Sequence, residues 1–206
     1  MTEGPAALTV RQPETRARRV SPDARRDALL DRLEAVFLAE GFSDLTIDDL
    51  CRRLQCSKTT LYSIAGSREQ IIQAVTRHFF ARATDTIEEK VSLETDAAQR
   101  IVQYLDGVGS AMRSNSPAFY RDMVSYEPTA QIYRLNSDAA ARRVRVMIEE
   151  GVEAGAFRPT HAALASRAVA LLIDGVQSGE LLAGTELSAG EAYSEIGELI
   201  VNGLLA

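Results

Sequence analysis

The sequence predicts an all-α fold in which a small N-terminal unit of three helices precedes a larger helical domain. Two observations carry this prediction. Apolar residues recur at three- and four-residue spacing through most of the 206 residues, and residues that cap helices stand where these runs begin. No alternation of apolar and polar residues persists long enough to indicate a strand. The chain is 46% apolar and 25% charged, as is ordinary for a globular protein.

The first helix is predicted to follow Ser21, because Ser21 can cap a helix and Pro22 suits its first position. Its apolar face consists of Leu29, Leu30, Leu33, Val36 and Phe37. The helix should end at Gly41, since glycine readily adopts the left-handed conformation that terminates helices. The preceding residues 1–20 carry four arginines and no apolar periodicity, so we expect them to form a flexible basic arm.

Two short helices are predicted next. Thr46 can cap the first of them, with Asp49 three residues later as its capping partner. Gln55 and Cys56 leave room only for a tight turn before Ser57, which can cap the second. Helices of two turns are not stable alone, so the three N-terminal helices must pack on one another.

A longer helix should start after Ser67 and run to about residue 90, joining the small unit to the rest of the chain. Breaks rich in Pro, Gly, Ser and Asn then divide the remainder into further helices. These are expected at residues 95–114, 117–124, 128–154, 161–183 and 188–205. The predicted organisation is a basic arm (1–20), a three-helix unit (21–67), a connecting helix (68–90) and a helical domain (91–206).

The segment from Gly41 to Tyr62 has the layout of a helix-turn-helix. A short helix and a tight turn precede a second short helix, which opens with Ser57, Lys58 and Thr59. Recognition helices place such polar groups at their N-terminal end in the major groove of DNA. The free backbone N–H groups of a helix start also suit phosphate. The pattern therefore favours a DNA-binding unit.

This segment resembles the N-terminal signature of the tetracycline-repressor (TetR) family of transcriptional regulators. The resemblance covers about residues 25–80 and rests on Gly41, Phe42, Thr46, Ile47, Leu50, Ser57, Thr60, Leu61, Tyr62, Ser67 and Glu69. The sequence departs from the signature at Cys51, Gln55, Cys56, Ala65 and Arg68. Gln55 stands where the family has glycine, which leaves the geometry of the turn open.

The resemblance implies a repressor that binds a palindromic operator in double-stranded DNA as a homodimer and leaves it when a small effector binds. It implies that Thr46, Tyr62 and Arg68 hold phosphates and that side chains at the start of the second short helix face the groove. For Tyr62, a core ring with an exposed hydroxyl is the alternative. The predicted DNA-binding residues are Thr46, Ser57, Lys58, Thr59, Thr60, Tyr62, Ser63 and Arg68.

In this family the C-terminal domain holds a ligand cage, and this sequence supplies Met and aromatic residues in helices that must face one another. Such adaptable side chains suit a mostly apolar small molecule. The predicted effector-binding residues are Tyr104, Met112, Phe119, Tyr120, Met123, Tyr126, Tyr133 and Met147, with Asp174 and Gln177 as polar anchors. Plain core packing, or exposure to solvent for the two polar residues, is the alternative.

The last two predicted helices are more apolar than one small domain needs. Paired with their symmetry mates they would form a four-helix bundle, and a monomer core is the alternative. The predicted dimer interface consists of Leu164, Leu172, Val176, Ile196, Leu199 and Ile200.

The charge distribution fits this interpretation, although the net charge is −6. Residues 11–68 carry about +2 and residues 93–206 carry −6, so an acidic chain can still present a basic face. The two histidines, His78 and His161, stand apart, and no metal-ligand spacing or phosphate-binding loop is present. We therefore expect no enzyme, cofactor or metal site. No membrane span or export signal is predicted, which favours the cytoplasm. A helical ligand carrier or adaptor that does not bind DNA remains the alternative function.

Overall fold

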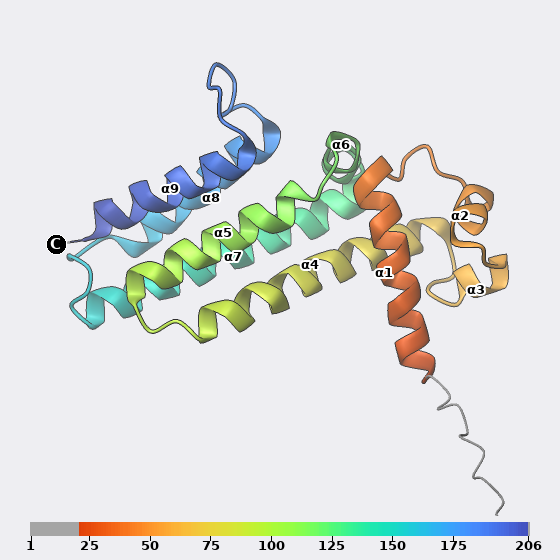
Figure 1. Cartoon of the computed structure of the whole chain (residues 1–206), viewed down its shortest axis with the longest axis horizontal. Helices are drawn as coiled ribbons and strands as arrows, with labels where there is room; N and C mark the ends of the chain where they lie inside the picture. Colours follow the sequence, from red (N-terminus) through yellow and green to blue (C-terminus); the bar gives the residue numbers. More distant parts are fainter. Residues whose placement is uncertain (1–20, 206) are drawn as a thin grey trace, which may run out of the picture.

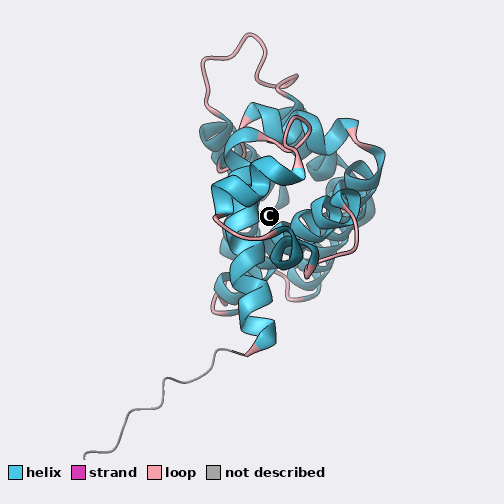
Figure 2. Cartoon of the chain, turned by 90° about the vertical axis from the view of Figure 1, so that its right-hand side faces the viewer, coloured by secondary structure: helices cyan, strands magenta, loops and turns pink. Residues whose placement is uncertain are grey.

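The computed structural model describes residues 21–205, and every regular element in that range is a helix (Figure 1, Figure 2). The predicted basic arm, residues 1–20, lies outside the described residues. The helices are α1 (Pro22–Glu40), α2 (Ile47–Leu54), α3 (Lys58–Tyr62), α4 (Arg68–Ser92), α5 (Ala97–Arg113), α6 (Pro117–Ser125), α7 (Glu127–Glu153), α8 (Ala162–Ser178) and α9 (Ala189–Leu204). Within residues 21–205, no helix has the length and apolar character that crossing a membrane requires.

Apart from α7, which begins after Tyr126 without a side-chain cap, the helices begin where the sequence places residues that can cap them. Ser21, Ser67 and Ser116 each accept a hydrogen bond from a backbone N–H in the first turn of α1, α4 and α6. One predicted end is wrong: α8 stops at Ser178 rather than at residue 183. The reason is Gly179, which adopts a left-handed conformation (φ 79°) and turns the chain.

The long helices form the body of the molecule, and the small helices lie at one end of it. In Figure 1, α4, α5 and α7 run alongside one another, α1 crosses α4, and the C-terminus lies at the end opposite α2 and α3. Helix α9 packs on α5, and α8 packs on α7. The structure thus separates the helix-turn-helix from the apolar C-terminal pair α8 and α9.

Two hydrophobic cores hold these helices together. The first core contains residues of α1, α2, α3 and α4, together with residues of α6 and of the start of α7. Phe37, Ile71 and Phe119 are examples. The second joins the end of α4 to α5, α7, α8 and α9. Helix α6, which belongs to the C-terminal half of the sequence, is therefore part of the core beneath the helix-turn-helix.

The loop between α1 and α2 is fixed directly by α6. The backbone N–H groups of Phe42 and Ser43 donate to Oδ2 of Asp122 over 2.7 and 2.9 Å. Gly41 makes this approach feasible, because it has φ 79° and a Cβ there would lie 2.5 Å from the same oxygen. The ring of Phe42 packs against the rings of Phe37 and Phe119. This loop connects the helix-turn-helix to the rest of the protein.

Candidate nucleic-acid interface and ligand cavities

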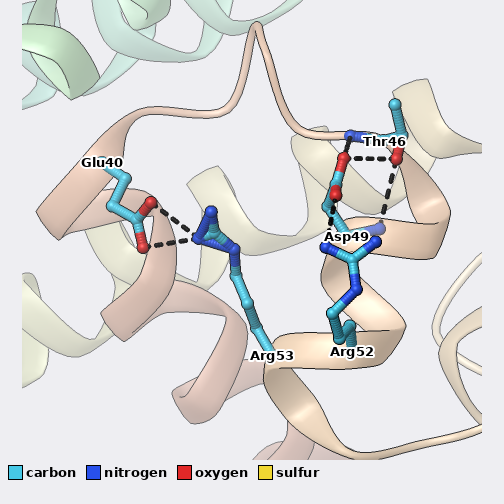
Figure 3. A network of polar contacts seen from close by, with 5 residues as sticks. All are labelled: Glu40, Thr46, Asp49, Arg52 and Arg53. Carbon is cyan, nitrogen blue, oxygen red and sulfur yellow. Dashed lines mark hydrogen bonds and ion pairs between the residues drawn. The ribbon is translucent and has the colours of Figure 1, made fainter.

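Helix α2 is anchored at its start by a complete capping box (Figure 3). The backbone N–H of Asp49 donates to Oγ1 of Thr46, and the N–H of Thr46 donates to Oδ2 of Asp49, both over 3.1 Å. The hydrogen bonds from Thr46 hold the pKa of the Asp49 carboxyl below its ordinary value. The Thr46 hydroxyl also donates to this carboxylate. The side chain expected to contact phosphate therefore already caps the helix.

The turn between α2 and α3 forms without a glycine. Gln55 adopts the left-handed conformation itself, with φ 49° and ψ 48°, and its N–H donates to a carbonyl at the end of α2. The N–H of Cys56 donates to the carbonyl of Cys51 over 3.0 Å, which closes the turn. From α1, the guanidinium of Arg32 donates to the carbonyl of Leu54. The departure from the family signature at this position thus leaves the helix-turn-helix intact.

Helix α3 presents its polar side chains to solvent. Ser57 caps it, since its Oγ accepts from the N–H of Thr60 over 3.1 Å. Leu61 points into the first core, whereas Lys58 and Thr59 are exposed. Tyr62 is 41% exposed, which contradicts the alternative of a core ring.

Several basic side chains next to α3 are already paired with acids. Arg52 contacts Asp49, and Arg53 contacts Glu40 over 2.6 Å (Figure 3). Lys58 Nζ lies 2.8 Å from a carboxylate oxygen of Asp48 on α2, which raises the pKa of the lysine. These pairs are exposed to solvent, where an ion pair contributes little and is readily exchanged for another anion.

Positive charge that has no ion-pair partner in the described part of the chain lies instead on α1. The start of α1 and helix α3 border an open groove of about 780 Å³. Its polar lining consists of Asp23, Arg25, Arg26, Arg32, Ser57, Thr59, Thr60 and Ser63. Within residues 21–205, Arg25 and Arg26 make no ion pair. The sequence-based prediction missed these arginines because their position beside α3 depends on how α1 packs.

Arg68 was predicted to contact a phosphate, but its side chain binds backbone carbonyls of the protein. Its half-buried guanidinium donates to the carbonyls of Leu45, Phe42 and Ser43, over 2.9, 2.7 and 3.0 Å. These carbonyls belong to the loop whose N–H groups bind Asp122. Arg68 therefore ties the start of α4 to the loop before α2, and most of its donors are used within the protein.

Two adjoining cavities lie among the long helices. The α6-side cavity, of about 500 Å³, is bordered by α5, α6, α8 and α9. The α4-side cavity, of about 260 Å³, is bordered by α4, α5, α7 and α8. Met112 and Gln177 line both. An ion pair in the α4-side cavity joins Arg143 to both oxygens of Glu88, over 2.8 and 3.0 Å.

Half of the predicted effector-binding residues border these cavities. Tyr104 and Tyr133 line the α4-side cavity, Tyr120 lines the α6-side cavity, and Met112 and Gln177 line both. Burial raises the pKa of Tyr104 to about 12. Asp174 lines neither cavity and is exposed to solvent, as its alternative had it, and its Oδ1 accepts a hydrogen bond of 2.8 Å from the Tyr133 hydroxyl.

The other four predicted effector residues lie elsewhere. Phe119 and Met123 are fully buried in the first core, because this face of α6 packs against α1 and α4. Met147 is buried in the second core. Tyr126 packs against the ring of Phe42. None of the four borders either of these two cavities, so the cavities give no support to their prediction as ligand contacts.

The predicted dimer residues are divided between a surface and a core. Leu164 and Leu199 are 68% and 69% exposed, which is unusual for leucine. Leu172 and Ile200 are half-buried, at the edge of the second core. Val176 and Ile196 are buried inside the protomer, because their faces of α8 and α9 turn toward the long helices, so their assignment to an interface is wrong. Leu171, 58% exposed, lies on the open face of α8 and was not predicted.

Solved structures with the same arrangement cover almost the whole chain. A TetR transcription regulator from Haloarcula marismortui superposes with a TM-score of 0.74 at 18% identity, covering 89% of this chain and 100% of its own. A putative transcriptional regulator from Saccharomonospora viridis, solved in complex with choline, gives a TM-score of 0.74 at 18% identity, covering 90% and 100%. The TetR-family regulator PfmR from Thermus thermophilus gives 0.60 at 21% identity, covering 86% and 99%.

No protein-family model and no curated protein sequence matches the chain. Its likeness to these structures therefore lies in the arrangement of the helices over 86 to 90% of the chain rather than in close sequence similarity. The chain has the fold of the TetR-family transcriptional regulators.

Proposed function

We propose that the protein is a cytoplasmic, sequence-specific DNA-binding transcriptional repressor that acts as a homodimer. The observation that carries the proposal is the exposed polar surface of α3 beside Arg25 and Arg26 of α1, which have no ion-pair partner among residues 21–205. Lys58 and Thr59 would reach base edges there, and the two arginines would meet phosphates. Thr60, Tyr62 and Ser63 add further hydroxyl groups to this surface. Lys58 would exchange Asp48 for DNA on binding, since their ion pair is exposed.

The dimer would form through the open faces of α8 and α9. Leu164, Leu171 and Leu199 leave an apolar surface there that a symmetry mate would cover. Each dimer would present two copies of α3, so the operator should be a palindrome with half-sites about one turn of DNA apart.

A small, mostly apolar effector would bind in the two cavities and release the operator. Their mixed lining of apolar residues, tyrosines and a few polar groups is typical of ligand sites. A regulator of the same fold was solved with choline, which supports a ligand role for this domain. The cavities alone would equally suit a ligand carrier, so DNA binding is the property to test.

The test is a selection of duplexes from a random pool by the full chain, followed by titrations of the selected and a scrambled duplex at several salt concentrations. Lys58→Ala should cost about 1 to 3 kcal/mol on the selected site and less on scrambled DNA. Arg25→Ala should weaken binding to both and lower the log-log salt slope by about two units, one phosphate for each protomer. Arg145→Ala on α7, paired with Glu149, is the matched control and should change neither. Equal affinities of parent and variants for both duplexes would remove the proposal.

A further inference from the structure

A cluster of tyrosines gathers where the two cavities adjoin. The rings of Tyr120 and Tyr133 meet edge to face at 6.2 Å, and Tyr133 also packs against Phe80 at 6.3 Å. The hydroxyl of Tyr133 donates to Asp174 over 2.8 Å and contacts the side-chain amide of Gln177. Aromatic faces, a carboxylate and an amide therefore converge at one place.

The direction of these hydrogen bonds decides what a ligand must offer. A tyrosine hydroxyl has one proton, and an ionised Asp174 can only accept, so the proton of Tyr133 goes to Asp174. Oε1 of Gln177 also faces this hydroxyl and is left without its proton. The Tyr133 hydroxyl thus faces two acceptors, only one of which receives its proton, so acceptor capacity is left over at the cluster.

The charge at the cluster is negative, and Asp174, which carries it, is exposed to solvent. Within residues 21–205, Asp174 makes no ion pair, whereas Glu88 and Arg143 in the α4-side cavity neutralise each other. The charge of Asp174 reaches both neighbouring rings, since it contributes to the raised pKa of Tyr120 and of Tyr133, after the larger effect of burial. The other nearby charge, Arg113, is exposed at the α6-side cavity and donates to Ser110.

We propose that this cluster binds an organic cation, with a substituted ammonium group against the rings of Tyr133 and Tyr120 and an apolar body in the α4-side cavity. Aromatic faces attract cations by their quadrupole, and the carboxylate behind the Tyr133 hydroxyl strengthens that attraction. Ile87, Val108 and Ile173 offer the apolar body a matching wall. The cavity, at about 260 Å³, lies just below the range of drug-sized sites, so the cation is small.

This inference deepens the proposed function, because it names the chemical class of the effector. Its test is calorimetric titration of the full chain, without DNA, with benzyltrimethylammonium, benzyl alcohol and phenylacetate as cationic, neutral and anionic probes. The cation should bind at least about tenfold more tightly than either of the others. Asp174→Asn should lower the affinity for the cation about tenfold and leave that for benzyl alcohol unchanged.

The matched control is Asp138→Asn, an exposed carboxylate of α7 that borders neither cavity, and it should have no effect. Tyr120→Leu, which keeps an apolar side chain but removes the ring, should weaken binding of the cation alone. Tighter binding of phenylacetate, lost in Arg113→Gln, would overturn the proposal in favour of an anion site. Equal affinity for all three probes, or an unchanged affinity in Asp174→Asn, would also overturn it.

The outcome is independent of the DNA test. A chain that binds the cation but no duplex would retain the cation site and lose the repressor function. A chain that binds its selected duplex but no cation would retain the repressor function and lose the proposed ligand class. Release of the selected duplex by the cation would join the two.

Discussion

Replacing Arg68 by alanine should destabilise the protein through the loop between α1 and α2. The change removes three hydrogen bonds from a half-buried guanidinium to the carbonyls of Phe42, Ser43 and Leu45. A hydrogen bond to a charged group contributes about 1.5 to 3 kcal/mol, but the three share one side chain and solvent reaches part of it. We therefore expect a loss of about 2 to 4 kcal/mol in the free energy of unfolding rather than the full sum.

The assay is urea unfolding followed by circular dichroism, together with DNA titrations at several salt concentrations. Arg68→Lys should recover little of the lost stability, because an ammonium cannot reproduce the forked donors. Arg52→Ala is the matched control, since Arg52 has a 74% exposed side chain and one surface ion pair, and it should cost less than about 1 kcal/mol. DNA binding by Arg68→Ala should weaken while the salt slope stays that of the parent.

A different result would refute this reasoning. If Arg68→Ala unfolds at the same urea concentration as the parent but its salt slope falls by about two units, the residue is a phosphate contact. Full activity and stability of Arg68→Lys would point the same way, because charge alone would then suffice. The structural role assigned to the three carbonyl bonds would be wrong in either case.

Three further predictions concern other parts of the structure. Gly41→Ala should lower the free energy of unfolding by more than about 2 kcal/mol, because it adds a steric clash to the cost of a positive φ. Gly184→Ala, with φ 81° and open space around it, should show the backbone cost alone. Equal losses in urea unfolding would contradict this. Leu199→Glu should yield monomers in sedimentation. Leu93→Glu, at an 82% exposed leucine of the α4–α5 connection, should leave the dimer intact. A parent protein that is monomeric at micromolar concentration would exclude the dimer. Tyr104 has a pKa raised to about 12, so its contribution to stability is full below pH 10 and is lost as the pH rises to 12, by roughly 2 to 3 kcal/mol. Tyr104→Phe should remove that alkaline loss, and an unchanged pH profile of the unfolding free energy would show that the hydroxyl is not desolvated.

The sequence was sufficient where structure is decided locally. Capping residues and helical spacing placed every helix from α1 to α9 within a few residues, because the cap of α2 at Thr46 or of α3 at Ser57 depends only on its own first turn. Glycine was the expected residue for the turn before α3, yet Gln55 adopts the same left-handed conformation, held by hydrogen bonds that the sequence does not display.

The cavities were only half predictable, because Met and aromatic side chains suit cores and ligand sites equally. Phe119 and Tyr120 are neighbours in sequence but lie on different faces of α6, and Phe119 is buried in the first core whereas Tyr120 borders the α6-side cavity. Which side meets a cavity depends on the packing of α1 and α4, which periodicity does not report. For the same reason the sequence did not reveal Arg25 as a neighbour of α3. It also did not predict the contacts of Arg68, because the carbonyls that Arg68 binds lie more than twenty residues away in the sequence.

The attachment of Asp122 to the loop before α2 has a practical meaning for attempts to transplant the helix-turn-helix. A fragment cut after residue 67 would leave the N–H groups of Phe42 and Ser43 without their acceptor and would expose the rings that α6 and α4 cover. A chimera that gives these helices a new sensory domain must therefore bring a helix equivalent to α6 with it. In this protein the unit that can be transplanted is discontinuous in sequence, since it consists of α1 to α4 together with α6.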